Sequence, residues 1–314
     1  MQIKKLKHPY SKEDIHDEAV ILILGFFDGV HKGHQAVIRR AVQIGQEKNL
    51  KTALMTFNRH PSIVYRSFAA ENYNYLTLNE EKMQKVKDLG VDYYYEIEFT
   101  SDFGNLSPQD FVDQYIVSWQ ADTVVAGYDY TYGPPDIANM ENLPKYAKGR
   151  FEIECVAPQM SGESAISSTR IRKNIVTGEI VQANQDLGYT YQTSGFVIHG
   201  EGRGRFLGYP TANIFTAPSY QLIPGIGVYA VEIAVKGQIY LGMASVGYNV
   251  TFEKLKRPSV EVNIFDFDSE IYGENVYVYW HDYLRGEKKF ASVDELIAQL
   301  ARDEIICREY FKNM

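Results

Sequence analysis

The stretch Gly25-Phe26-Phe27-Asp28-Gly29-Val30-His31-Lys32-Gly33-His34 decides the fold of the first half of the chain. It follows an apolar run at 19–24 and precedes a helical-looking run at 35–48. This order predicts a buried strand, a glycine-bearing turn and a helix N-terminus. The first backbone N–H groups of a helix lack an internal partner, and the helix dipole adds partial positive charge there. Because His31 and His34 fall on one face of the first turn, we interpret the stretch as a phosphate cradle.

Each feature of this stretch also has a plain structural interpretation. Glycine turns are common, and a single histidine near a helix start is often only a cap. The combination of strand, Asp28-Gly29, His31-x-x-His34 and helix is harder to explain in that way. H-x-G-H resembles the signature of the nucleotidyltransferase superfamily. The resemblance implies that the two histidines stabilise charge on nucleotide phosphates during transfer, and it leaves the acceptor open.

Length and composition restrict the class of protein. The 314 residues suffice for two domains, and 45% hydrophobic with 23% charged residues is typical of a globular protein. A formal net charge of −8 argues against a nucleic-acid partner. Cys155 and Cys307 are too far apart in sequence for a C-x-x-C motif. The best apolar run, 19–27, is too short to span a membrane, so we expect a cytoplasmic protein without a membrane partner. Weak self-association stays open.

The first half alternates strand-like and helix-like segments, which is typical of an α/β domain with a mainly parallel sheet. We expect helices at 79–89 and at 107–119, the second with a serine cap and proline at its first position. The expected strands are 20–25, 52–57, 92–99, 123–130 and 151–156. Ligands of such sheets bind beyond the carboxyl ends of the strands.

Three further motifs follow predicted strands or precede a predicted helix. Thr56-Phe57-Asn58-Arg59-His60-Pro61 and Gly127-Tyr128-Asp129-Tyr130-Thr131-Tyr132-Gly133 each have an equally good interpretation as plain turns. Ile166-Ser167-Ser168-Thr169-Arg170-Ile171-Arg172 places hydroxyls and two arginines at a helix start. Such hydroxyls are usually caps, but with the histidines upstream the motif favours phosphate binding.

The pattern changes after a short helical link at 180–187. From residue 191 apolar and polar residues alternate with period two, and turn residues recur about every ten positions. A capped helix at 293–311 ends the chain. The expected strands are 193–199, 228–235, 239–246, 259–267 and 276–283. We therefore predict a small antiparallel β-barrel with a C-terminal helix, and place the domain boundary between residues 184 and 185.

The chemistry of the second half is expected in the loop 200–213, Gly-Glu-Gly-Arg-Gly-Arg-Phe-Leu-Gly-Tyr-Pro-Thr-Ala-Asn. A flexible turn is the usual interpretation of Gly-Arg repeats. However, Thr211 and Asn213 supply neutral oxygens two residues apart, which suit a Mg²⁺ shell completed by water and phosphate. Glu261, on a predicted strand, is either a solvent-facing residue or a general base, and spacing does not decide between them.

Family resemblance narrows these choices. G-F-F-D-G-V-H-K-G-H, T-F-x-x-H-P, G-x-D-[FY] and I-S-S-T-x-I-R occur in this order in the FMN adenylyltransferase module of bacterial FAD synthetases. G-x-G-R-G-x-x-L-G-[FY]-P-T-A-N, a later V-E-[VS], and L-R before a capped helix resemble riboflavin kinase. Together they resemble the prokaryotic bifunctional riboflavin kinase/FAD synthetase family over essentially the whole chain. The resemblance implies an N-terminal Rossmann-like nucleotidyltransferase fold and a riboflavin kinase-like barrel.

The resemblance also implies roles for single residues in the second half. Glu261 matches the base that deprotonates the terminal hydroxyl of riboflavin for attack on the ATP γ-phosphate. Thr211 and Asn213 match the Mg²⁺ and ATP positions, and Arg285 matches a flavin-side position. Gly202 and Gly204 fall in the glycine-rich loop expected to bind ATP.

In the first half, the resemblance implies that the FMN phosphate attacks the ATP α-phosphate and releases pyrophosphate. His31, His34 and Arg172 would stabilise this transition state electrostatically. The remaining expected ATP or phosphate contacts are Gly25, Phe26, Asp28, Gly29, Ser168 and Thr169, and the expected flavin contacts are Phe57, His60, Pro61 and Asp129.

One segment departs from the family pattern. Pro134-Pro135-Asp136-Ile137-Ala138-Asn139 lies where the family carries a basic, glycine-containing loop. The alternative to a bifunctional enzyme is therefore a riboflavin kinase with a weakened or vestigial adenylyltransferase domain. A flavin-sensing regulator is a third hypothesis, although it would need neither Glu261 nor the pair Thr211 and Asn213.

Overall fold

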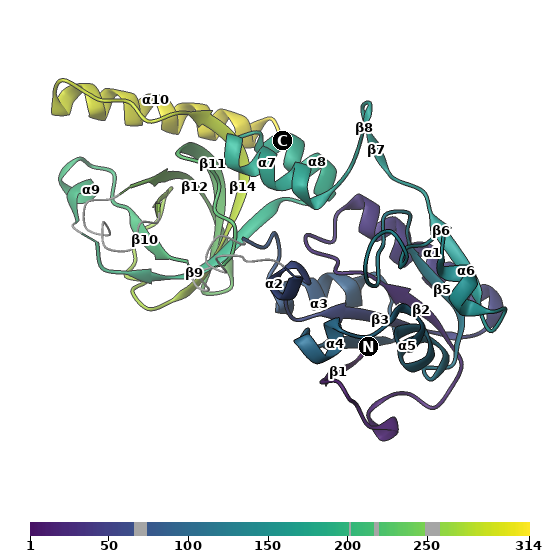
Figure 1. The fold of residues 1–314 in the computed structure, drawn as a ribbon. Coiled ribbons are helices and arrows are strands. Elements are labelled where there is room, and N and C mark those ends of the chain that lie inside the picture. The colour runs from purple at the N-terminus through teal and green to yellow at the C-terminus, as the bar shows by residue number, and fades with distance from the viewer. Residues whose placement is uncertain (66–73, 201, 217–219, 249–257) are drawn as a thin grey trace. The chain divides into compact units, whose positions relative to one another are not determined.

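The computed structural model describes residues 1–65, 74–200, 202–216, 220–248 and 258–314 (Figure 1). Glu201 of the glycine-rich loop lies outside them. The chain divides into two compact units, Met1–Tyr73 with Thr77–Ser167 and Asn74–Leu76 with Ser168–Met314. Helices α7 (Ser168–Thr177) and α8 (Ile180–Leu187) belong to the second unit, where α8 contacts the barrel strands. The functional boundary after residue 184 stays a prediction.

The first unit is built on a six-stranded parallel sheet in the order β1-β4-β3-β2-β5-β6. Its strands are β1 (Gln2–Leu6), β2 (Val20–Leu24), β3 (Lys51–Phe57), β4 (Tyr93–Ile97), β5 (Ala121–Gly127) and β6 (Glu152–Val156). The parallel α/β prediction is thus confirmed, with the edge strand β1 as an addition.

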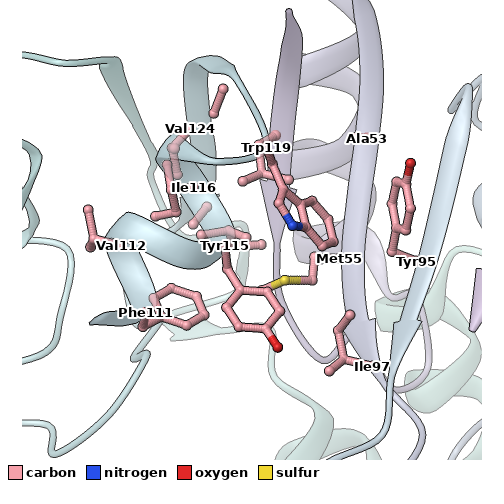
Figure 2. Packing of buried hydrophobic residues seen from close by; sticks show 14 of the residues in the cluster. Ala53, Met55, Tyr95, Ile97, Phe111, Val112, Tyr115, Ile116, Trp119 and Val124 are labelled. Carbon is pink, nitrogen blue, oxygen red and sulfur yellow. The ribbon is translucent and has the colours of Figure 1, made fainter. Parts of the chain in front are cut away.

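Apolar residues cover both faces of this sheet. Successive side chains of a strand point to opposite faces, so Ile21 and Ile23 pack with α1 (Lys32–Lys48) and with Val86 of α3 (Asn79–Asp88). Leu22 and Leu24 pack on the other face, in a cluster that includes Trp119 and the aromatic residues of α5 (Pro108–Phe111) and the π-helical turn η3 (Val112–Val117) (Figure 2). The predicted cap is present, because the Ser107 hydroxyl accepts from the N–H of Asp110 at 3.1 Å.

Short elements complete the first unit. They are η1 (Lys12–Asp14), α2 (Ser62–Tyr65), α4 (Ser101–Gly104), α6 (Leu143–Ala147) and the hairpin of β7 (Met160–Ser161) and β8 (Ser164–Ala165).

The second unit is a closed antiparallel barrel with strand order β10-β13-β12-β11-β14-β9. Its strands are β9 (Tyr191–Ile198), β10 (Ala212–Phe215), β11 (Gly227–Val235), β12 (Gln238–Gly247), β13 (Ser259–Ile264) and β14 (Asn275–Arg285). A short helix α9 (Arg203–Phe206) precedes β10, and α10 (Val293–Lys312) packs Cys307 against Ala230 and Met243 of the barrel. The barrel and its C-terminal helix were predicted, whereas α9 and β10 were not.

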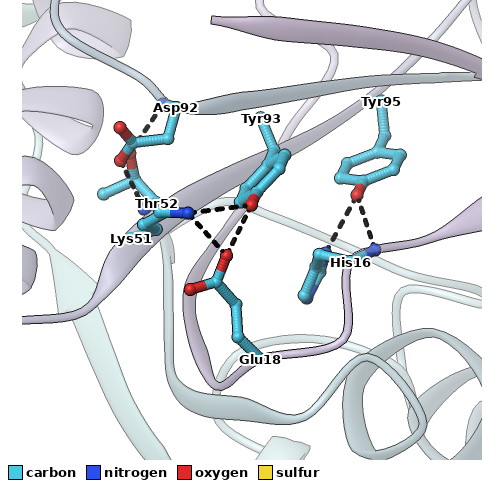
Figure 3. A network of polar contacts seen from close by, with 7 residues as sticks. All are labelled: His16, Glu18, Lys51, Thr52, Asp92, Tyr93 and Tyr95. Atoms are coloured by element: carbon cyan, nitrogen blue, oxygen red, sulfur yellow. Dashed lines mark hydrogen bonds and ion pairs between the residues drawn. The ribbon is translucent and has the colours of Figure 1, made fainter.

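A polar network holds the amino ends of β3 and β4 (Figure 3). The Glu18 carboxylate pairs with the Lys51 ammonium at 2.8 Å and accepts from the Tyr93 hydroxyl. His16 is buried between the Tyr95 hydroxyl, 2.9 Å from Nδ1, and the Trp119 carbonyl, 2.8 Å from Nε2. Burial lowers the pKa of His16.

Across the described ranges, no helix is long and apolar enough to cross a membrane.

We expect the first unit to lose stability as the pH falls below about 6.5, the ordinary histidine pKa. The pKa of His16 is lower in the folded protein than in the unfolded chain. The stabilisation that neutral His16 gives the folded state is therefore fully present above the unfolded pKa and is lost as the pH falls through the folded pKa. Calorimetry between pH 7.5 and 5 should show the wild-type unfolding temperature falling roughly 2–4 °C further than that of His16→Gln. Equal slopes for the two proteins would contradict this prediction.

Candidate functional site

The turn after β2 has an unusual backbone. Phe27, Gly29 and Val30 have φ angles of 57°, 84° and 36°, a region that L-residues with side chains rarely occupy. The Phe27 ring folds back over Gly25, where a Cβ atom would lie 2.6 Å from the ring. Glycine at position 25 is therefore required by the path of the turn itself.

Thr77, two residues before α3, fixes this turn. Its N–H donates to Asp28 Oδ1 at 3.1 Å, and its hydroxyl accepts from the N–H of Gly29 at 2.9 Å. Asp28 and Thr77 are both 3% exposed, so the two hydrogen bonds form away from water. Asp28, which is predicted to contact ATP, therefore also has a structural role in holding the turn.

The two predicted histidines lie together at the start of α1. His31 is the N-cap residue, and its Nδ1 accepts from the N–H of His34 at 3.3 Å. The two rings are stacked, with centroids 3.6 Å apart and an interplanar angle of 17°. A Cβ atom on Gly33 would lie 3.1 Å from the His31 ring, which explains the glycine between the histidines. Because Nδ1 of His31 accepts, its ring proton is on Nε2 in the neutral form.

The other predicted residues of the sheet edge differ in exposure. The rings of Phe26 and His60 contact each other edge to face at 5.0 Å, and His60 Nδ1 lies 2.7 Å from the Ser62 hydroxyl. Pro61, which lies between His60 and Ser62 in the sequence, is half-buried. Asp129, just after β5, is exposed. Phe57 is only 5% exposed, and its side chain packs in the hydrophobic core under this edge of the sheet.

The predicted second phosphate-binding motif begins α7, in the second unit. Ser168 and Thr169 are its first residues. Arg170 forms an ion pair at 3.0 Å with Asp186, which is 1% exposed, and so it holds α7 to α8. Arg172 Nε donates to the backbone carbonyl of Asn74 at 3.0 Å. The assignment of Arg172 as a phosphate contact stays a prediction.

The segment Pro134–Asn139 is a compact, hydrogen-bonded turn. The N–H of Ala138 donates to the Pro134 carbonyl at 2.8 Å, and the Ala138 carbonyl accepts from Tyr132 at 3.0 Å. Ala138 is fully buried. The Asn139 side chain accepts from the N–H of Asn142 at 2.9 Å, which joins the turn to α6.

In the barrel, the predicted kinase residues line one cavity of about 230 Å³. The Thr211 hydroxyl donates to Glu261 Oε2 at 3.2 Å. Asn213 of β10 and Ser245 of β12 lie directly opposite Glu261 on its two neighbouring strands, so the three side chains share one face. Gly202 and Gly204 also line this cavity.

A larger cavity of about 680 Å³ adjoins it and shares Thr211 and Glu261. Its other lining is largely apolar and includes Tyr209, Met243, Phe290, Leu296 and Leu300. A polar cavity beside a mostly apolar one suits a ligand with an apolar body and a polar end.

Arg285 lines the larger cavity and is tied to α10. Its Nε and Nη2 donate to the Asp303 carboxylate at 2.9 Å and 2.7 Å, and Gln299 donates to the same carboxylate at 2.7 Å. Asp303 is 1% exposed. The guanidinium is therefore held in one orientation, with Nη1 donating to the Gly286 carbonyl at 3.0 Å.

Two family models match the chain: FAD synthetase over residues 13–170 and riboflavin kinase over residues 187–311. The chain belongs to the bifunctional riboflavin kinase/FMN adenylyltransferase family. Proteins of that name from Listeria monocytogenes and Bacillus subtilis are 49% and 38% identical to it. The alignments cover 98% of this chain and 98% of the Listeria protein, and 100% of this chain and 99% of the Bacillus protein.

A solved structure has the same fold. The crystal structure of a macrolide-efflux protein from Streptococcus pneumoniae is 38% identical, with a TM-score of 0.89, and the match covers 98% of this chain and 99% of that one. That name belongs to the Streptococcus protein, whereas both family models match the present sequence.

The sequence patterns missed several residues that line the barrel cavities. Ser259 and Asn263 flank Glu261 at period two on β13, and Asn263 Nδ2 donates to the Pro210 carbonyl at 2.7 Å. The alternation Ser-x-Glu-x-Asn could have identified them. No sequence pattern points to Ser245 or Glu287. The register of β12 against β13 brings Ser245 to the cavity, and the turn after β14 brings Glu287 there.

The side chains at Thr211 fit a magnesium ion. Thr211 and Asn213 offer neutral oxygens beside the Glu261 carboxylate, and Mg²⁺ in proteins usually keeps water and phosphate as its other ligands. The residues that the structure describes include no cluster of three His, Cys, Asp or Glu that could form a cage for a metal ion.

Gly200→Ala should impair the kinase step without affecting FAD formation from supplied FMN. The new Cβ atom would lie 2.1 Å from Nδ2 of Asn213 and would displace that side chain from the cavity. Moving a positioning side chain by about 1 Å can lower a rate about 100-fold, so we expect a loss of about that size in the kinase rate. Steady-state kinetics of both steps would measure it.

Gly237→Ala is the matched control for a general loss of stability. Gly237 has a φ of 77° in the hairpin between β11 and β12, and nothing lies within 4 Å of its missing Cβ. The substitution should cost about 1 kcal/mol of stability and leave the kinase rate unchanged. A normal kinase rate in Gly200→Ala would show that the position of Asn213 is unimportant.

Proposed function

We propose that residues 185–314 phosphorylate riboflavin to FMN with ATP, and that residues 1–184 adenylylate FMN to FAD with release of pyrophosphate. Membership of the bifunctional family and the two family-model matches support both activities. They give no support to a vestigial first domain. The product of the first reaction is the substrate of the second, so the two steps form a sequence within one chain.

The contact between Thr211 and Glu261 carries the assignment of the kinase step. The carboxylate lies where the polar cavity meets the apolar one, so a flavin in the larger cavity could place its terminal hydroxyl beside Glu261. Glu261 would then take the hydroxyl proton while the oxygen attacks the γ-phosphorus of ATP. The bond from that phosphorus to the β,γ-bridging oxygen breaks, and ADP leaves. Gly202 and Gly204 line the polar cavity and carry no side chains of their own, so phosphates could approach their backbone closely.

Magnesium is the proposed cofactor. Thr211 and Asn213 would hold the ion, which when bound would neutralise charge on the ATP phosphates. The guanidinium of Arg285, which lines the larger cavity, would contact the flavin there.

For the adenylyl step, the cradle at the start of α1 is the proposed phosphate site. The positive end of the α1 dipole and the stacked rings of His31 and His34 would stabilise charge on the ATP phosphates as the FMN phosphate attacks. Ser168, Thr169 and Arg172 would provide further phosphate contacts. Phe26, His60, Pro61 and Asp129 would contact the flavin and the nucleotide.

Glu261→Gln tests the division of labour. We expect FMN formation from riboflavin to fall by about 100-fold to 10,000-fold, because a positioned base contributes that much. FAD formation from supplied FMN should persist. Chromatography of the products formed from riboflavin, ATP and Mg²⁺ measures both steps. Loss of both would be evidence against two independent sites.

Asn213→Ala tests the metal assignment. The Mg²⁺ concentration for half-maximal kinase rate should rise about tenfold, while that of the adenylyl step stays unchanged. Asn275→Ala, at an exposed position on β14, removes an equivalent amide away from the cavity. An unchanged Mg²⁺ dependence in Asn213→Ala would remove this residue from the metal site.

A further inference from the structure

Lys82, on α3, is a buried cation for which the proposed mechanism has no role. It is 2% exposed, although lysine is almost never fully buried without partners. Its position in the sequence Asn79-Glu80-Glu81-Lys82 predicted only a polar helix start. Since burying an unpaired ammonium is costly, its surroundings must compensate for the lost water.

Three oxygens surround the ammonium group. Lys82 Nζ donates to the backbone carbonyl of Phe26 at 3.3 Å, the Thr56 hydroxyl at 3.2 Å and the backbone carbonyl of Phe57 at 3.2 Å. The Thr56 hydroxyl in turn donates to the Phe26 carbonyl at 2.8 Å. An ammonium has three N–H donors, so the protonated form can satisfy all three acceptors and a neutral amine cannot.

These acceptors lie at the edge of the sheet where the proposed adenylyl site begins. Phe26 follows β2 and opens the cradle, and Phe57 ends β3 just before His60. Nζ also lies 4.7 Å from the centroid of the Phe26 ring, which contacts the His60 ring. One side chain thus joins the two turns expected to hold the phosphates and the flavin.

We propose that Lys82 is a positioning residue of the adenylyltransferase step. Its ammonium fixes the turn after β2 against the turn after β3, and at neutral pH it supplies a positive charge beside the turn that opens the phosphate cradle. This rests on the proposed location of the adenylyl step in the first half of the chain. Thr77 assists from the same segment, through its hydrogen bonds to Asp28 and Gly29.

The charge of this group depends on pH within an accessible range. Burial lowers the pKa of Lys82 to about 8, against the opposing effects of Asp28 in the turn and Glu96 on β4. Glu96 itself pairs with Lys5 of β1 at 3.7 Å, and His60 faces the same ring as Lys82. Carboxylates and imidazoles ordinarily titrate below pH 7, so a change near pH 8 is separable from theirs.

The test compares the two activities of the full-length enzyme from pH 6.5 to 9.5. For the wild type, kcat/KM for adenylylation of supplied FMN should fall above about pH 8, because deprotonation of Lys82 removes one donor and the charge. The riboflavin kinase rate is the internal reference and should show no such fall. A flat adenylylation profile up to pH 9.5 would overturn the proposal.

Lys82→Met removes the charge at similar side-chain length. We expect kcat/KM for adenylylation to drop about 10-fold to 100-fold at pH 7. The fall above pH 8 should disappear, and the kinase rate should stay normal. Lys85→Met is the matched control, since Lys85 lies one turn further along α3 and pairs with Glu81 at 3.6 Å. It should keep the wild-type profile. Wild-type adenylylation by Lys82→Met, or a persistent fall above pH 8, would contradict the proposal.

Two further measurements keep the outcomes distinct. Calorimetry of Lys82→Met shows whether the first unit folds, and if it does not, the wild-type pH profile alone decides. His34→Asn tests the underlying assignment. If His34→Asn retains full FAD formation, the proposed location of the adenylyl site is wrong. If only Lys82→Met retains it, that location stands and the role of Lys82 is refuted.

Discussion

The backbone turn at Phe27–Val30 is the constraint on which the first unit depends. Positive φ angles at non-glycine residues are unfavourable by about 1–3 kcal/mol each and persist only where surrounding contacts enforce them. Here the Phe27 ring packs over Gly25, and Thr77 holds Asp28 and Gly29 from outside the turn. The turn brings the chain from the buried strand β2 directly into α1, so the helix N-terminus and the stacked histidines face the sheet edge. Relaxing any of these contacts would redirect the cradle.

In the barrel, the register of the strands determines where the predicted site residues lie. Glu261 has Val260 and Val262 as neighbours, and these are 1% and 0% exposed. Because side chains alternate along a strand, a slip of one residue would bury Glu261 and expose both valines. The apolar core therefore fixes the register that places Asn213, Glu261 and Ser245 in one row. Closure of the barrel adds to this, since every strand has two partners.

The sequence predicted most strands because buried strands carry long apolar runs. It missed β1, β7, β8 and β10. The edge strand β1 is polar with two lysines, β7 and β8 have two residues each, and β10 has four residues directly after a glycine-rich loop. The histidine pair and Thr211 were singled out because their motifs are local, and the role of Glu261 was assigned only through the family resemblance. Lys82 and the pair of Arg285 with Asp303 were not, because their partners are distant in sequence and a helical lysine or aspartate usually faces water.

A protein with a net charge of −8 must concentrate positive potential where phosphates bind. The two units do this differently. In the first unit we expect the helix N-terminus and, at neutral pH, the buried ammonium of Lys82 to provide positive charge beside the cradle. In the second unit the Arg285 charge is offset by Asp303, and Lys288 and Lys289 line only the larger cavity. The polar cavity is lined by the carboxylates of Glu261 and Glu287. We therefore expect the barrel to depend more on an added divalent cation, for which Thr211 and Asn213 are suited. Metal dependence and alkaline pH should accordingly affect the two reactions of one chain to different degrees.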